Sequence, residues 1–179
     1  MAVQLIAVVQ GAPSPVVQGL LRDFVASLPP ALRVAGVIED VPEAEGEACN
    51  VGQLRSLRDG GAYTIVQDLG PGSTACKVDA GGIVTACEAV CRDIEAGCDL
   101  VVLSKWGKVE ADRSGLAVAF AAAIEAGVPV LTSVAPRFMP LWDRFAASMY
   151  VVLPPDAVSL AAWWRGQAAH RATSAPAVG

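Results

Sequence analysis

The sequence predicts an α/β fold built on a mostly parallel β-sheet into which one antiparallel hairpin is inserted. Short β-branched runs alternate with longer segments of helical periodicity, which is typical of parallel sheets covered by helices. Glycines end two of the helical segments, and an Asp-Gly-Gly turn separates two short strand-like runs. Because the 179 residues show no internal repeat or linker, we expect one α/β domain over residues 1–171 and a disordered tail over 172–179.

The first elements follow from this pattern in order. Residues 4–9 predict a buried strand, and Ser14 before Pro15 predicts the N-cap of a helix over 15–27. Residues 32–38 predict the second strand. The five acidic side chains within residues 39–50 predict a solvated loop after it.

The remaining elements begin with the hairpin and then alternate between helix and strand as before. Asp59-Gly60-Gly61 joins the two arms of the hairpin, and Gly97 and Gly127 each end a helix. We expect Asp156 to cap the final helix. The expected order is hairpin arms 53–58 and 62–67, glycine-rich loop 70–77, helix 80–96, apolar strand 99–103, loop 104–113, helix 114–126, strand 128–133, helix 140–148, strand 150–153 and a helix to about residue 170.

Composition excludes several classes of protein. The chain is 54% hydrophobic and 17% charged with a net charge of −5, and it has no cluster of Lys and Arg, so we expect no nucleic-acid partner. No apolar run approaches the ~20 residues that cross a bilayer, and no signal peptide is present, so we expect a cytoplasmic protein without membrane attachment. A sparingly charged surface, with Trp163 and Trp164 on the last helix, would suit a homo-oligomer.

The cysteines favour packing over metal binding. Cys87, Cys91 and Cys98 fall on one apolar stripe of the expected helix, where a cysteine behaves as a small hydrophobic residue. The alternative is a thiolate pair with Cys76 as a third metal ligand, but the Cys-x-x-Cys spacing of a structural zinc site is missing. The one histidine, His170, has no nucleophile near it in the pattern, so we assign no catalytic residue and no metal site, and the cofactor stays open.

Three loops follow expected strands, and in open α/β sheets ligands bind beyond the carboxyl ends of the strands. The first loop, Gly11 to Pro15, stands where a nucleotide-binding protein carries its phosphate loop. It contains no lysine, and its two prolines lack the N–H groups that cradle phosphate. We therefore read it as a strand-to-helix turn in which Ser14 offers a hydroxyl group.

The second and third loops carry the remaining candidate residues. The glycine-rich loop before a helix predicts an anion nest, with an ordinary turn as the alternative. Its candidates are Gly70, Gly72, Ser73, Thr74, Cys76 and Lys77. The third loop places two lysines and a tryptophan after an apolar strand, where the tryptophan either covers a ligand or anchors into the core. Its candidates are Ser104, Lys105, Trp106, Gly107, Lys108 and Glu110.

The stretches GPGSTACKVD, DLVVLSKWGKVE and GVPVLTSV resemble a bacterial family of unknown function, whose genes often lie near molybdate-transport genes. That family is distantly similar to small P-loop nucleoside-triphosphatases of the thermophilic type. The resemblance covers about residues 3–155 and implies a three-layer, P-loop-NTPase-like fold. It also implies molybdate as a candidate ligand.

Two departures from the triphosphatase pattern accompany the resemblance. Gly107 and Glu110 match its Gly-x-Met-Glu segment, but Ser104 and Lys105 stand where the magnesium-binding aspartate and the catalytic glutamate would be. The phosphate-loop lysine is missing as well. Because phosphoryl transfer depends on those groups, we expect no nucleoside-triphosphatase activity.

The sequence thus predicts a non-hydrolysing accessory protein that binds a phosphate-bearing molecule or a tetrahedral oxyanion such as molybdate. Lys77, Lys105 and Lys108 are expected to converge on its site. One alternative is an enzyme that uses Cys76 as a nucleophile or redox thiol, because a nearby lysine and a helix N-terminus lower a thiol pKa. Another is a P-loop-like homologue that retains nucleotide binding.

Overall fold

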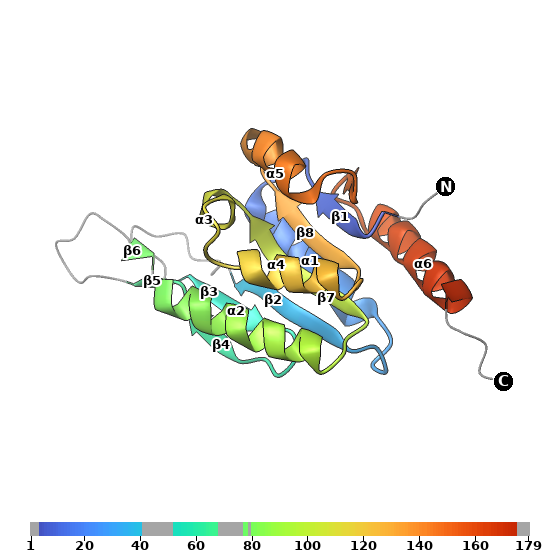
Figure 1. Cartoon of the computed structure of the whole chain (residues 1–179), viewed down its shortest axis with the longest axis horizontal. Coiled ribbons are helices and arrows are strands. Elements are labelled where there is room, and N and C mark those ends of the chain that lie inside the picture. The colour runs from blue at the N-terminus through green and yellow to red at the C-terminus, as the bar shows by residue number, and fades with distance from the viewer. Residues whose placement is uncertain (1–3, 41–51, 68–76, 79, 175–179) are drawn as a thin grey trace.

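The computed structural model describes residues 4–40, 52–67, 77–78 and 80–174. Within these ranges strands and helices alternate along the chain (Figure 1). In chain order they are β1 (Ile6–Val9), α1 (Ser14–Ser27), β2 (Val34–Asp40), β3 (Gln53–Ser56), β4 (Ala62–Thr64), β5 (Val66–Gln67), β6 (Lys77–Val78), α2 (Ala80–Glu95), β7 (Leu100–Trp106), α3 (Lys108–Ala111), α4 (Ala117–Glu125), β8 (Val130–Val134), the 3-10 turn η1 (Pro136–Phe138), α5 (Met139–Ala146), β9 (Tyr150–Leu153) and α6 (Ala157–Ser174).

Seven of the strands form one sheet in the order β4-β3-β2-β7-β8-β1-β9. The five strands from β2 to β9 in this order pair in parallel, whereas β3 and β4 add an antiparallel hairpin at one edge. The predicted mixed α/β architecture with an inserted hairpin is therefore confirmed. Strands β5 and β6 pair separately as a small antiparallel ribbon.

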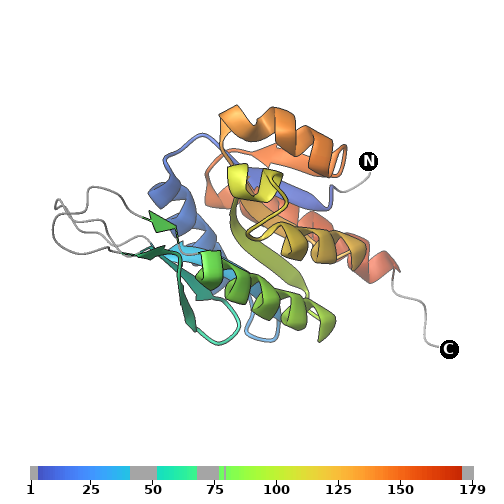
Figure 2. The same cartoon turned by 60° about the vertical axis from the view of Figure 1, so that its left-hand side comes forward.

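Helices cover both faces of the sheet, so the molecule has three layers (Figures 1 and 2). Successive residues of a strand point to opposite faces. In β1, Ile6 packs in the core beneath α2, α4 and α5, whereas Ala7 packs in the core beneath α1 and α6. Strand β7 alternates in the same way, and burial on both faces explains why these strands read as continuous apolar runs.

Local signals placed most of the elements correctly. Gly60 adopts a φ of +74° in the hairpin turn, where the Asp59 carboxylate accepts a hydrogen bond of 2.9 Å from the Gly61 N–H. At the last helix, the Asp156 carboxylate accepts a hydrogen bond of 2.8 Å from the Ser159 N–H, which confirms the predicted cap. In the described part of the chain, none of the helices is long and apolar enough to cross a membrane.

The N-cap prediction for Ser14 was wrong. Ser14 is the first residue of α1 and its side chain makes no capping hydrogen bond, because Pro13 takes the N-cap position. The Pro13 carbonyl accepts hydrogen bonds from the N–H groups of Val16 and Val17, at 3.0 and 3.1 Å. The Ser14 hydroxyl is thereby left exposed at the start of the helix.

Several expected boundaries also moved. The second hairpin arm, expected over residues 62–67, is divided into β4, which pairs with β3, and β5, which pairs with β6. Strand β2 extends through Glu39 and Asp40, so these two acids belong to the sheet, whereas residues 41–50 of the expected acidic loop lie outside the described residues. The helix expected from Ser114 begins only at Ala117, after the separate short helix α3. Helix α6 runs to Ser174, so residues 172–174, which were expected in a disordered tail, belong to the helix.

Candidate functional site

A pocket of about 370 Å³ opens where β1, β7 and β8 end at their carboxyl edge. Its wall is built from the ends of these three strands and the segments that follow them: Val9–Ala12 with Ser14 and Val17, Lys105–Glu110, and Ser133–Phe138. The chain leaves β1 toward α1 on one face of the sheet and leaves β8 toward α5 on the other face. Diverging connections of this kind leave a crevice between them, which is where ligands bind in open α/β sheets.

Three cationic side chains line this pocket against one acidic side chain, Glu110. Lys105 comes from the end of β7 and Lys108 from the start of α3, both within the segment predicted as a loop, and Arg137 comes from η1. In the described ranges, neither Lys108 nor Arg137 forms an ion pair, and the Arg137 guanidinium lies 4.9 Å from the centre of the Phe138 ring. The pocket wall therefore carries a local positive charge in a protein with a net charge of −5.

Trp106 lies in the wall of the pocket but belongs to the core. The loop expected from Ser104 was wrong, because β7 continues through Trp106, which pairs with Val134 of β8 beyond an irregular register. Its ring is 2% exposed and meets Trp142 edge to face, with ring centres 5.4 Å apart. Its indole nitrogen is buried and has no hydrogen-bond partner among the described residues.

Glu110 shapes the loop rather than offering a free carboxylate. One of its oxygens accepts a hydrogen bond of 3.0 Å from the Gly107 N–H, and the other accepts one of 3.2 Å from the Leu116 N–H. Gly115 has a φ of +59°, which favours glycine, and a Cβ there would stand 2.5 Å from Glu110 Oε1 and displace the carboxylate. Both carboxylate oxygens are thus used to fold residues 107–116 around the pocket.

The carbonyl of Ser104 ties three elements together below the pocket. Ser104 is 2% exposed and does not line the pocket, although the sequence analysis included it in the site. Its carbonyl accepts hydrogen bonds from Gln18 Nε2 of α1, at 2.8 Å, and from Ser133 Oγ of β8, at 2.9 Å. Residue 104 therefore holds the strand ends in place, whereas Ser14 lies in the pocket wall.

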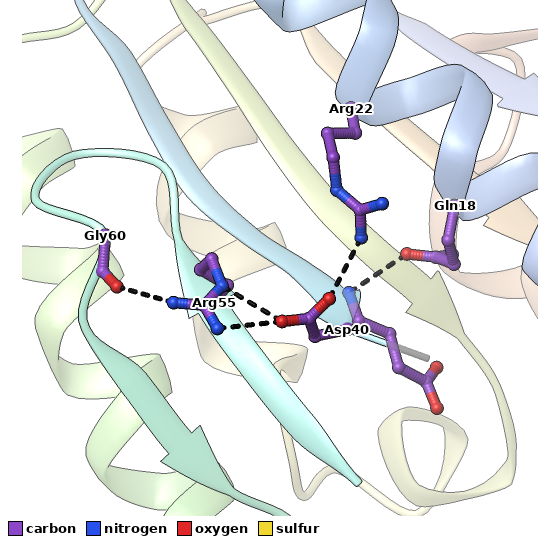
Figure 3. Close-up of polar contacts among 6 residues, drawn as sticks. Gln18, Arg22, Asp40, Arg55 and Gly60 are labelled. Atoms are coloured by element: carbon purple, nitrogen blue, oxygen red, sulfur yellow. Dashed lines mark hydrogen bonds and ion pairs between the residues drawn. The ribbon is translucent and has the colours of Figure 1, made fainter. Parts of the chain in front are cut away.

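A second group of charges stands beside the pocket, at the end of β2. Lys105 Nζ lies 2.7 Å from Glu39 Oε2, so the charge of this lysine is already offset by a carboxylate. Figure 3 shows the neighbouring Asp40 held between Arg22 and Arg55. The sequence analysis had placed both acids in a solvated loop, whereas the sheet brings each of them against a cation.

Several predicted residues cannot be placed in the pocket. Gly70, Gly72, Ser73, Thr74 and Cys76 lie outside the described residues. Lys77 is described only as the first residue of β6, paired with Gln67 in the small ribbon. Of the three lysines expected to converge, Lys105 and Lys108 both line the pocket.

Arg137 is the site residue that sequence reasoning missed. It follows β8 by three positions, in the segment Ala135-Pro136-Arg137-Phe138. The rule that sites gather at the carboxyl ends of strands, applied to β8 as it was to the other strands, would have found it. Gln10 was missed as well, and its side-chain amide donates a hydrogen bond of 2.7 Å to the Val134 carbonyl, which joins the ends of β1 and β8.

The cysteines of α2 and its end pack against the core, as their apolar stripe predicted. Cys87 and Cys98 are buried, and Cys91 is half-buried. Burial, with a smaller effect from the neighbouring Cys87 thiol, raises the pKa of Cys91 to about 11. Within the described ranges no cluster of three or more His, Cys, Asp or Glu side chains is arranged to hold a metal ion.

The chain is similar to a segment of a much larger protein. It is 38% identical over 148 residues to a protein of Bradyrhizobium diazoefficiens named "Molybdenum import ATP-binding protein ModC 2". That match covers 82% of this chain and 16% of the other protein. No solved structure matches the chain.

A family match covers nearly the whole described fold. Residues 6–163, from the first strand of the sheet into the last helix, match the family described as "Protein of unknown function (DUF2478)". That range includes all three segments that build the pocket. The chain therefore belongs to the DUF2478 family.

Proposed function

We propose that the protein binds a small anion, either a tetrahedral oxyanion or a phosphate-bearing molecule, in the pocket at the ends of β1, β7 and β8, without hydrolysing it. The observation that carries this proposal is the meeting of Lys105, Lys108 and Arg137 on one pocket. Cationic groups in a recess with apolar walls attract anions more strongly than the same groups in open water. The volume of about 370 Å³ suits a small ligand.

The neutral groups of the pocket support the same proposal. The Ser14 hydroxyl lies in the pocket wall, is exposed and makes no capping bond. It can donate a hydrogen bond, and an anion accepts one. The acid in the wall, Glu110, already accepts hydrogen bonds from two backbone N–H groups, whose dipoles offset part of the repulsion between its carboxylate and an anion.

The proposal excludes phosphoryl transfer on chemical grounds. The turn after β1 offers no lysine, and the acidic pair that would hold magnesium and activate water is replaced by Ser104 and Lys105. Ser104 is buried with its carbonyl engaged twice. The three-layer fold, with a mostly parallel sheet and a helix directly after β1, supports a P-loop-NTPase-like fold that lacks the catalytic groups.

Molybdate is the oxyanion that we propose first. The relative in Bradyrhizobium diazoefficiens is named for molybdenum import and ATP binding, and the matching segment is a minor part of it. We infer that this chain serves as an accessory anion-binding protein in the handling of molybdate. Sulfate, ATP and GTP are the comparison ligands, because sulfate shares the tetrahedral dianion and the nucleotides carry phosphate groups.

Isothermal titration of the purified protein with molybdate, sulfate, ATP and GTP tests the proposal. Lys108→Ala and Arg137→Ala should each weaken binding of the anion about tenfold, equivalent to about 1.4 kcal/mol, by removing one charge-assisted contact. Arg165 is an exposed residue of α6 that does not line the pocket, so Arg165→Ala removes the same charge and should leave the affinity unchanged. Heat from none of the four ligands would overturn the proposal, and so would equal losses in all three variants.

A further inference from the structure

Lys105 stands between two anionic partners, one present in the protein and one supplied by the ligand. Its side chain lines the pocket, yet its ammonium lies 2.7 Å from Glu39 Oε2, and Glu39 is not part of the pocket wall. The lysine side chain is 53% exposed and the glutamate side chain only 18%. The lysine is thus the more exposed partner of this pair, and its long side chain has solvent space to move into, whereas the glutamate side chain is largely enclosed.

Hydrogen bonds fix the backbone on both sides of the ion pair. The Glu39 N–H donates to Gln18 Oε1 at 3.1 Å, and the amide nitrogen of the same Gln18 donates to the Ser104 carbonyl at 2.8 Å. Gln18 is 1% exposed, so this link between β2 and β7 is buried. A change in the Lys105–Glu39 pair therefore moves side chains and leaves the strand ends in place.

The Glu39 carboxylate depends on Lys105. Its Oε2 atom is buried, and the Lys105 ammonium at 2.7 Å is the one group among the described residues that offsets its charge. Burying a carboxylate without a cationic partner costs free energy, so Glu39 keeps Lys105 as its partner until an anion that attracts the ammonium more strongly enters the pocket. A ligand must overcome this contact before Lys105 can bind it.

We propose that Glu39 is an internal competitor for the anion site, a carboxylate that occupies Lys105 when the pocket is empty and sets the affinity of the pocket for anions. The proposal rests on the function proposed above and deepens it. An anion of charge two, held at the same time by Lys108 and Arg137, draws the Lys105 ammonium away from the single negative charge of Glu39. The pocket is thereby tuned toward dianions such as molybdate and sulfate.

The next residue supplies a matched control. Asp40 carries the same charge one position along β2, but it pairs with other cations (Figure 3). Its Oδ1 lies 3.3 Å from Arg22 Nη2, and its Oδ2 accepts hydrogen bonds of 3.0 and 2.8 Å from Arg55. Arg55 also donates to the Gly60 carbonyl at 3.1 Å. Neutralising Asp40 changes the net charge equally without releasing Lys105.

The experiment titrates the full chain with sodium molybdate and sodium sulfate. Glu39→Gln should tighten binding of both about fivefold, since a partly exposed ion pair contributes up to about that factor. Asp40→Asn should change affinity less than about twofold, because only the long-range charge differs. In a Lys105→Ala background, Glu39→Gln should have no further effect, since the competing partner is gone.

The outcomes separate the two proposals. Wild-type protein that binds neither molybdate nor sulfate overturns this inference, and the proposed function falls with it only if ATP and GTP give no heat either. Wild-type protein that binds, with Glu39→Gln equal to or weaker than wild type, overturns the inference alone. Equal tightening by Glu39→Gln and Asp40→Asn also overturns it, because the effect would then be one of net charge. Circular dichroism of each variant at the titration temperature establishes that all of them are folded.

Discussion

Replacing Gly36 with alanine should destabilise the protein severely, although the change adds one methyl group. Gly36 lies in the middle of β2, paired with Val102 of β7, and its φ is +123°. A Cβ at this position would stand 1.8 Å from the Val102 carbonyl oxygen, and 2.7 and 2.8 Å from the carbonyl carbon and amide nitrogen of that residue. All three are backbone atoms of a buried neighbouring strand, so none can turn away.

Two costs add at this position. An L-residue in a sparsely populated backbone conformation costs about 1–3 kcal/mol, and overpacking a well-packed core costs about 1–3 kcal/mol more. We therefore expect Gly36→Ala to lower the free energy of unfolding by about 4 kcal/mol, a large share of the ~5–15 kcal/mol typical of a folded domain. For a chain of this length that corresponds to a fall in Tm of about 8–16 °C.

Thermal unfolding followed by circular dichroism measures the effect, with urea unfolding as a check on two-state behaviour. Gly19→Ala is the matched control, because Gly19 lies within α1 and a Cβ there would meet nothing within 4 Å. That substitution should raise the free energy of unfolding by about 1 kcal/mol, the difference in helix propensity between the two residues. A Gly36→Ala protein with the Tm of wild type would refute the geometry assigned to β2 and β7.

Two further predictions concern titratable groups. Hydrogen bonds from the Ser159 backbone N–H and hydroxyl lower the pKa of Asp156 at the start of α6. The stabilisation from this cap is therefore fully present above the ordinary carboxyl pKa of about 3.9 and is lost as the pH falls through the lowered value. Asp156→Ala should therefore have a lower Tm than wild type at neutral pH, with Asp156→Asn between them. The difference in Tm between wild type and Asp156→Ala should shrink as the pH falls, and a difference that stays the same on acidification would contradict this assignment. Burial raises the pKa of Cys91 to about 11, so its alkylation by iodoacetamide, followed by peptide mass spectrometry, should be slow at pH 7 and rise about tenfold per pH unit to at least pH 9. A rate that levels off near pH 8.5, as for a free thiol, would be inconsistent with a buried Cys91.

Local sequence signals predicted the elements whose causes are local. Asp59, Gly60 and Gly61 form their turn through a contact within the turn itself, and Asp156 caps α6 through a residue three positions away. The apolar stripe of α2 placed its cysteines against the core. Each of these features depends on neighbours along the chain, so the sequence displays all the groups involved.

Boundaries set by a neighbouring strand could not be read in this way. Ser104 and Trp106 look like the start of a polar loop, but β8 continues beside them and Trp106 packs against Trp142 of α5. Glu39 and Asp40 look like the start of a solvated acidic loop, but β3 and β7 bring a cation to each of them. In both cases the deciding partner is far away in the sequence.

The candidate site divides along the same line. The sequence by itself determined the α/β class, because the hydrophobic periodicities of strand and helix are local, and it pointed to Lys105 and Lys108 at a strand end. Only the tertiary structure set Glu39 against Lys105, since parallel pairing brings together the carboxyl ends of strands that lie far apart in the chain. It also showed that Arg137, which the strand-end rule applied to β8 would have indicated, lines the same pocket. Which charges are free and which are already paired is therefore decided by the sheet, and that balance is what the proposed function rests on.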